Sequence, residues 1–330
     1  MAIQQLPIIS FAQLDSEHER SRLRWAASEV GFFYLVDHGL SAQELTDIMT
    51  LSQQFFALPA AEKDRVDMRY SPHFRGYNAI GQELTGGAVD MREQFDWMNE
   101  ASAVNTPEHD WQCLIGANLW PQALPQLRHQ LLALTARQTT VAVTLLRALC
   151  ESLGLPANAL DESFKDAPYT HAKLIKYPGS KASRQGVGAH KDPGYLTFVL
   201  QDQQSGLEVE HQGSWIDVKP LANSFVVNIG ELLELASDGF LQATNHRVRA
   251  PEAGTERYSV AYFMAAQLDA TVPVLDLPAA MKAVSKGVST DPDNPLLSHV
   301  GENVLKGRIR SHPHAGTASD RDTPQLACGF

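Results

Sequence analysis

The second half of the chain consists of short β-rich runs separated by turn residues, and this pattern limits the possible folds more than any other feature. Such runs follow one another at intervals of roughly ten residues. They occupy residues 172–177, 196–200, 207–209, 215–218, 225–229, 246–248 and 259–264. Strands at this spacing predict an antiparallel β-sandwich or a jelly roll.

The N-terminal part mixes helices and strands. Residues 20–30 predict a helix, and residues 32–36 predict a strand because they are apolar and β-rich. Ser41 and Glu44 have the spacing of a capping box, which predicts that another helix begins there. Residues 70–120 carry many Gly, Pro and Asn residues, and we expect irregular structure there.

A long amphipathic helix precedes the β-rich half. Its apolar residues recur at helical spacing from Leu127 to Leu149, and Gly154 marks its end. We expect this helix to cover the sheet and not to bind a ligand. After the strands the chain becomes rich in loops, with one helix predicted at residues 296–309 and a polar tail from Ser311.

Composition and charge exclude several classes of protein. The chain has 330 residues and a net charge of −11, so it offers no basic face for nucleic acid. No run approaches the roughly 18–20 apolar residues that span a bilayer, and the first residues do not resemble a signal peptide. Cys113, Cys150 and Cys328 are widely spaced and are interpreted as free thiols of a reducing compartment. We therefore expect a soluble cytoplasmic protein.

Two histidines and an aspartate form a candidate metal site. If His190 closes a strand, its side chain and that of Asp192 point to the same side, because alternate residues share a face. The pair alone means little, since the composition predicts about 0.7 His-x-Asp pairs by chance. His246 would add a second imidazole on one face of an octahedron. This ligand set is typical of non-haem iron(II) oxygenases and leaves three positions open.

Arg257 and Ser259 form a candidate anion site. Both would lie on one face of a strand, so a guanidinium and a hydroxyl point the same way. The run at residues 260–264 is apolar on both faces and predicts an internal strand, in which an arginine needs a buried anionic partner. The pair suits the far carboxylate of a dicarboxylic acid.

A series of motifs resembles the isopenicillin N synthase-like group of iron(II)/2-oxoglutarate oxygenases over nearly the whole chain. Their common order and spacing make the match far more specific than any one motif. They are Leu6-Pro7-Ile8-Ile9, Gly31-Phe32-Phe33-Tyr34 through His38-Gly39, Arg75-Gly76-Tyr77, Asn118-Leu119-Trp120-Pro121, Lys173-Leu174-Ile175-Lys176-Tyr177-Pro178, His190-x-Asp192, Asn228-Ile229-Gly230-Glu231, Asn245-His246-Arg247-Val248 and Arg257-x-Ser259.

The resemblance implies a mainly β fold with flanking helices around a double-stranded β-helix (jelly-roll) core. Residues 1–120 would form the family's N-terminal α/β region, and residues 121–167 a packing helix and linker. Residues 168–270 would form the oxygenase core, and residues 271–330 a C-terminal helix and polar tail. The metal would lie inside the open end of the barrel.

The resemblance also assigns cofactors and their binding residues. The implied iron(II) ligands are His190, Asp192 and His246. Arg257 and Ser259 would hold the distal carboxylate of the co-substrate 2-oxoglutarate, with a hydroxyl added by Tyr177. The implied reaction uses 2-oxoglutarate and O2 to oxidise a small organic molecule by hydroxylation, desaturation or cyclisation.

The substrate side is expected around residues 75–95, which wall the pocket in the family and also resemble the bacterial ethylene-forming enzyme. Glu83 and Thr85 would contact a polar substrate, and Phe263 would line the pocket on its iron-facing side. The Asn228-to-Glu231 motif is interpreted as a turn in which Gly230 adopts a positive φ.

Three other functions stay open from the sequence. An isopenicillin N synthase-like oxidase uses no 2-oxoglutarate, and its Tyr, Arg and Ser hold a substrate carboxylate. An ethylene-forming reaction would consume 2-oxoglutarate itself. A jelly-roll binding protein would hold a metal without turnover, although pure binding needs neither open metal positions nor an anion clamp. The sequence names neither the prime substrate nor the oligomeric state.

Overall fold

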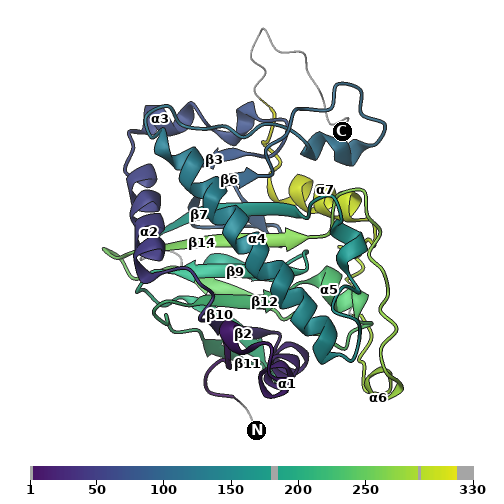
Figure 1. Ribbon diagram of the computed structural model, residues 1–330. Coiled ribbons are helices and arrows are strands. Elements are labelled where there is room, and N and C mark those ends of the chain that lie inside the picture. The colour runs from purple at the N-terminus through teal and green to yellow at the C-terminus, as the bar shows by residue number, and fades with distance from the viewer. Residues whose placement is uncertain (1–2, 180–184, 289–290, 318–330) are drawn as a thin grey trace.

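Two facing β-sheets form the centre of the protein in the computed structural model, which describes residues 3–179, 185–288 and 291–317 (Figure 1). The strands of the larger sheet, in pairing order, are β1 (Ile8–Ser10), β2 (Phe32–Val36), β12 (Phe225–Ile229), β9 (Leu196–Gln201), β14 (Glu256–Ala265), β7 (Tyr169–Pro178), β6 (Glu93–Met98) and β3 (Gly76–Asn78). Those of the smaller sheet are β11 (Ser214–Asp217), β10 (Leu207–His211), β13 (His246–Arg249) and β8 (Gln185–His190). The predicted mainly β jelly roll is confirmed.

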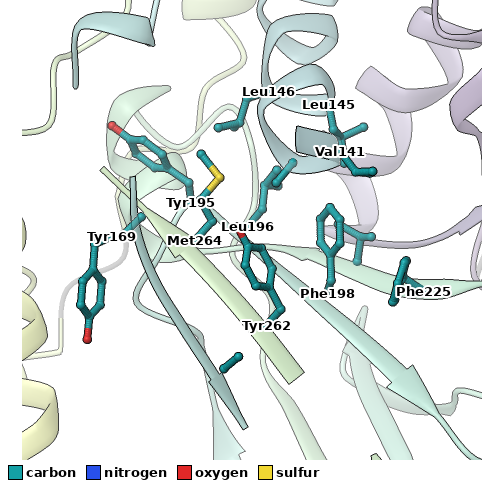
Figure 2. Packing of buried hydrophobic residues seen from close by; sticks show 14 of the residues in the cluster. Val141, Leu145, Leu146, Tyr169, Tyr195, Leu196, Phe198, Phe225, Tyr262 and Met264 are labelled. Carbon is teal, nitrogen blue, oxygen red and sulfur yellow. The ribbon is translucent and has the colours of Figure 1, made fainter. Parts of the chain in front are cut away.

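Helices lie around the two sheets, and the longest of them covers the outer face of the larger sheet. They are α1 (Glu17–Trp25), α2 (Ala42–Phe56), α3 (Ala60–Asp64), α4 (Gln126–Ser152), α5 (Glu231–Ala236), α6 (Ala279–Lys282) and α7 (Val300–Ser311). The long helix α4 runs diagonally across the sheet (Figure 1). Figure 2 shows its Val141, Leu145 and Leu146 against the sheet residues Leu196, Phe198, Tyr262 and Met264. This helix therefore has the covering role that its leucine spacing predicts.

The two faces of strand β14 carry different kinds of side chain, one packed in the core beneath α4 and the other facing the space between the sheets. Its even-numbered residues from Val260 to Met264 belong to the core beneath α4. Ala261 and Phe263 instead belong to a second cluster, which fills the space between the two sheets. Because side chains alternate along a strand, Arg257 and Ser259 point to this inner face as well.

Two N-terminal predictions are confirmed, whereas the helix predicted at residues 20–30 begins earlier, at Glu17, and changes to a π-helical turn at residues 26–30. Strand β2 has the predicted limits, and both hydrogen bonds of the capping box formed by Ser41 and Glu44 are present at the start of α2. No helix in the described part of the chain is both long and apolar enough to cross a bilayer. Cys328 and most of the predicted polar tail lie outside the described residues.

Two local predictions are wrong. Residues 70–120 are not wholly irregular, because β6 pairs with six residues of β7; Gln94 and Asp96 on its inner face hide the usual apolar signal of a buried strand. Gly230 has φ −96°, so it does not serve a left-handed turn. A Cβ there would lie 2.1 Å from the carbonyl oxygen of Gly194, so close backbone approach explains the glycine.

Candidate metal centre

The three predicted metal ligands converge where β8 ends and β13 begins. His190 is the last residue of β8 and pairs directly with His246, the first residue of β13. The Oδ1 atom of Asp192 lies 3.5 Å from Nε2 of His190 and 3.6 Å from Nε2 of His246. Two atoms that are bonded to the same ion at about 2.0–2.2 Å lie at most about 4.4 Å apart. Both measured distances are shorter than this limit, so one ion can bond Oδ1 of Asp192 together with either histidine nitrogen.

Neighbouring groups orient each of these side chains. The Nδ1–H of His190 donates to the carbonyl of Gly188 at 2.8 Å, and that of His246 donates to the carbonyl of Thr244 at 3.2 Å. Each imidazole therefore presents its Nε2 lone pair to the centre. Asn228 donates to Oδ2 of Asp192 at 2.9 Å and leaves Oδ1 to face the two nitrogens.

The electrostatics favour the metal-binding protonation states of Asp192 and His246, whereas in the metal-free site they favour a proton on His190. Burial, together with the adjacent His190, lowers the pKa of His246 to about 4. Although burial opposes ionisation, the two imidazoles hold the pKa of Asp192 well below its ordinary value. Burial lowers the pKa of His190, but its contact with Asp192 outweighs this effect and raises it.

This donor set fits iron(II). Two imidazoles and one carboxylate on one face suit a non-haem iron(II) ion and leave its other positions for exogenous ligands. The side chain of His190 is 31% exposed, against 4% for Asp192 and 9% for His246. The centre is therefore accessible on the His190 side and enclosed by protein on the other.

Arg257 lies on the inner face of β14 as a buried cation, and the described part of the chain gives it no anionic partner within ion-pair distance. It is 1% exposed. Its Nη2 donates to the side chain of Gln201 at 3.0 Å, and its Nε donates to the carbonyl of Gln204 at 3.3 Å. Its Nη1 has no hydrogen-bond partner. A buried guanidinium with a free donor fits an anionic ligand.

The two residues predicted to assist Arg257 lie close to it. Tyr177 is its cross-strand neighbour on β7, and the guanidinium carbon lies 5.0 Å from the centre of the tyrosine ring. Ser259 is two residues along the same face of β14 and is buried. Ser259 pairs with Ile175 of β7. The apolar side chain of Ile175 therefore lies between Tyr177 and Lys173 on the inner face of β7.

On the substrate side, Glu83 is buried in ion pairs. Arg92 and Lys173 each donate to its carboxylate at 2.7 Å. Although burial favours the neutral acid, these two cations hold the pKa of Glu83 well below its ordinary value. Thr85 donates to Asp90 at 2.7 Å, so both predicted contact residues belong to one polar region.

Further charged groups extend this region across the inner face. Asp96 of β6 accepts from His171 at 2.7 Å and from Arg308 of α7 at 3.2 Å. We call the six charged residues of the region the charge cluster: Glu83, Asp90, Arg92, Asp96, Lys173 and Arg308. Its three carboxylates and three cations balance, while burial lowers the pKa values of His171 and His312 beside it to about 3.

Phe263 links the cluster to the inner face near the metal ligands. Its ring stacks on His171 with centroids 5.0 Å apart and an interplanar angle of 13°. Phe263 pairs with Thr197 of the neighbouring strand β9, and Thr197 pairs on its other side with Asn228 of β12. Asn228 is the residue that donates a hydrogen bond to Asp192. Sequence reasoning missed the roles of Asn228 and of the cluster residues Asp96, Lys173 and Arg308. The available signals were two matching motifs, the one that begins with Asn228 and the one that begins with Lys173.

Two family models cover most of the chain. The model described as the N-terminal part of the non-haem dioxygenase in morphine synthesis matches residues 6–123, and that of the 2OG-Fe(II) oxygenase superfamily matches residues 169–266. The 2-oxoglutarate-dependent dioxygenase frbJ of Dothideomycetidae sp. is 30% identical over 100% of this chain and 95% of its own. The chain belongs to the iron(II)/2-oxoglutarate-dependent oxygenases. It is a dioxygenase that uses iron(II), 2-oxoglutarate and O2 to oxidise a small organic molecule.

Other members of this oxygenase family give the same result. Homoarginine-6-hydroxylase 2-ODD-233 of Oryza sativa subsp. japonica is 33% identical over 75% of this chain and 77% of its own. The crystal structure of a protein from Caulobacter crescentus, described as of the 2OG-Fe(II) oxygenase family, has a TM-score of 0.73 and 24% identity, covering 93% of this chain and 99% of that one. At that identity the structural likeness supports the fold alone.

Proposed function

We propose that His190, Asp192 and His246 bind the iron(II) of this oxygenase and that Arg257 and Ser259 bind the distal carboxylate of 2-oxoglutarate. The convergence of the three ligand atoms, all within 4.8 Å of one another, carries this proposal. The free Nη1 of buried Arg257 supports the second part. When bound, the iron supplies the redox chemistry that couples 2-oxoglutarate decarboxylation to substrate oxidation.

The protein's own groups position the reactants and exclude water. Arg257 offers a fixed fork to a carboxylate, and its Tyr177 neighbour shields that fork from solvent. Asn228 keeps Asp192 oriented, so that the ligand geometry does not depend on solvent. Phe263 and the residues of the charge cluster would then form the wall against which a substrate lies.

We further propose that the substrate is a small zwitterion contacted by Glu83, with Thr85 and Phe263 beside it. The charge cluster holds equal numbers of buried positive and negative groups. The ammonium of a zwitterion can therefore pair with one of its carboxylates while the carboxylate of the zwitterion pairs with one of its cations, and no charge is left unpaired. A neutral ligand offers no such exchange. Relatives named homoarginine-6-hydroxylases, which their name assigns to a charged amino acid, support this substrate class.

The division of the chain into functional regions is also proposed here. Residues 1–120 would form the N-terminal region, 121–167 the packing helix and linker, 168–270 the oxygenase core and 271–330 the C-terminal part. The two family-model matches, at residues 6–123 and 169–266, support the first and third regions. Arg308 of α7 reaches Asp96, so the last region contributes to the substrate wall.

The test measures succinate formation from 2-oxoglutarate with iron(II) and O2 against a panel of basic and neutral amino acids. Each neutral amino acid is paired with its methyl ester and its N-acetyl derivative, which lack one of the two charges, and each basic amino acid is paired with its methyl ester and its diacylated derivative, which lack the carboxylate and both cations respectively. At least one zwitterion should stimulate succinate formation tenfold or more over both derivatives. If all members of each set act alike, the zwitterion proposal is wrong.

Two variants separate the residue roles. Glu83→Gln should raise the KM for the stimulating amino acid and leave the KM for 2-oxoglutarate unchanged. Arg257→Met should do the reverse, because Arg257 and Glu83 make no shared contacts. Ethylene release, measured in the same reactions, distinguishes an ethylene-forming reaction. Substrate oxidation without succinate would instead favour the oxidase alternative.

A further inference from the structure

A second buried arginine, Arg75, lies against a cavity that the metal centre and the charge cluster do not use. The cavity has a volume of about 320 Å³, which is within the range of small-molecule sites. Its walls are mainly apolar and include Trp111, Leu114, Ile115 and Leu268. Ala101 and Asp269, which are exposed, lie at its rim. The cavity therefore opens to solvent and has Arg75 buried within it.

Arg75 has no anionic partner in the described part of the chain. It is 1% exposed, and its guanidinium donates only to backbone carbonyls: Nη1 to that of His73 at 2.7 Å and Nη2 to that of Asn99 at 3.4 Å. Its Nε is buried without any partner. Burial, reinforced by the neighbouring Arg308, lowers the pKa of Arg75 to about 10. A guanidinium in this position is stabilised by any anion that reaches it.

The nearby acidic groups do not fill this role. Glu100 influences Arg75 only through space, because its carboxylate accepts from the side chains of Asn118 and Trp120. Asp96 is bonded to Arg308 and to His171. The positive charge of Arg75 is therefore left uncompensated, in contrast to the balanced charge cluster.

Tyr169 supplies a second hydrogen-bond donor at the cavity. It points away from the α4 side chains (Figure 2) and lines the cavity together with Arg75. Its hydroxyl donates to the thioether sulfur of Met98 at 3.1 Å, which is a weak acceptor. An anionic oxygen would be a better partner, so Tyr169 can be redirected at little cost.

We propose that this cavity binds a small organic monocarboxylate, with its carboxylate on Arg75 and Tyr169 and its apolar body against Trp111 and Leu268. The acidic rim residue Asp269 disfavours a second anionic group at the outer end, which limits the ligand to one carboxylate. The cavity shares no lining residue with the Arg257 site, so the acid binds together with 2-oxoglutarate and does not compete with it.

The test titrates the iron(II) enzyme, saturated with 2-oxoglutarate and kept free of O2, by calorimetry. The probes are benzoate, phenylacetate and hexanoate, each compared with its primary amide. At least one acid should bind about tenfold or more tightly than its amide, because a charge-assisted bond to Arg75 is lost in the amide. If no acid exceeds its amide by threefold, the proposal is wrong.

Two variants place the binding at this cavity. Arg75→Met should remove the preference for the acid, and Ala101→Trp should block the cavity at its exposed rim without disturbing Arg75. Ala133→Trp, on an exposed position of α4, is the matched control and should bind the acid normally. All three should bind 2-oxoglutarate as the parent protein does. An acid preference that survives in Ala101→Trp would overturn the assignment even if Arg75→Met failed to fold.

After O2 is admitted, succinate formation shows how the acid is used. An acid that is itself oxidised stimulates succinate formation, whereas a separate ligand of the cavity does not. Both results agree with the site, and neither depends on the zwitterion proposal, which is tested with different compounds and with Glu83→Gln.

Discussion

Replacing Arg257 by methionine should weaken 2-oxoglutarate binding far more than it affects the fold. The guanidinium has one donor without a partner and two bonds to neutral acceptors, at 3.0 and 3.3 Å. Truncating one member of a buried, hydrogen-bonded charge pair costs about 2–5 kcal/mol. This corresponds to a Kd for 2-oxoglutarate that rises about 30-fold at the lower end and several thousand-fold at the upper end.

The ligand-free protein should respond differently. Methionine removes two hydrogen bonds but also removes a buried charge that has no counter-ion, and these effects oppose each other. In the presence of 2-oxoglutarate at 100 times its Kd, the parent protein gains about 2.7 kcal/mol of stability by mass action. The variant at the same concentration should lose about two-thirds of this gain at the lower end of the range and nearly all of it at the upper end, while its stability without ligand changes much less.

Thermal unfolding with and without 2-oxoglutarate, in iron(II) without O2, measures both quantities. The control is Arg137→Met, which removes a half-exposed arginine paired with Glu44 on the surface. It should retain the full 2-oxoglutarate-induced increase in Tm. If folded Arg257→Met binds 2-oxoglutarate within threefold of the parent protein, the assignment of Arg257 to the co-substrate carboxylate is refuted.

Three other predictions follow from the described contacts. Asn228→Ala removes the bond to Asp192 and should lower iron(II) affinity about 10- to 100-fold; an unchanged metal titration would contradict this. Leu145→Ala should destabilise the protein by about 2–5 kcal/mol in urea unfolding, and a loss below about 1 kcal/mol would mean that α4 packs loosely. Burial lowers the pKa of His171 to about 3, so the unfolded chain takes up the proton first. Stability should therefore fall as the pH drops from about 6.5 towards 3, by up to about 2 kcal/mol at pH 5. In His171→Asn this part of the slope should disappear, and an identical slope would refute the buried neutral state.

The sequence could predict those parts of the fold and site that rest on local patterns. The internal strand after Arg257 follows from its apolar run. The common orientation of His190 and Asp192 is inferred on the condition that a strand ends at His190, and the structure has that strand. A strand apolar on both faces also predicts burial, and Arg257 is indeed buried. These features need no knowledge of which distant segments meet.

The charge cluster could not be predicted in this way. Asp96, Lys173 and Arg308 come from β6, β7 and α7, which are distant in the sequence. Each residue type is ordinarily exposed, and only the pairing of all of them makes their burial tolerable. Polar inner-face residues also leave β6 without the continuous apolar run by which a strand buried on both faces is recognised.

The two ends of the inner face obey different electrostatic rules, and this difference bears on selectivity. At the Arg257 end a buried cation has no ion-pair partner in the described part of the chain. A carboxylate that binds there forms a new ion pair, so its binding should be strong. At the charge cluster every group is already paired, so a zwitterion gains only the difference between two sets of ion pairs. Its affinity should therefore be modest. An analogue that lacks the ammonium leaves a buried partner such as Glu83 unpaired, which costs about 2–5 kcal/mol. Discrimination between the zwitterion and its N-acetyl derivative should thus exceed tenfold even when the zwitterion itself binds weakly.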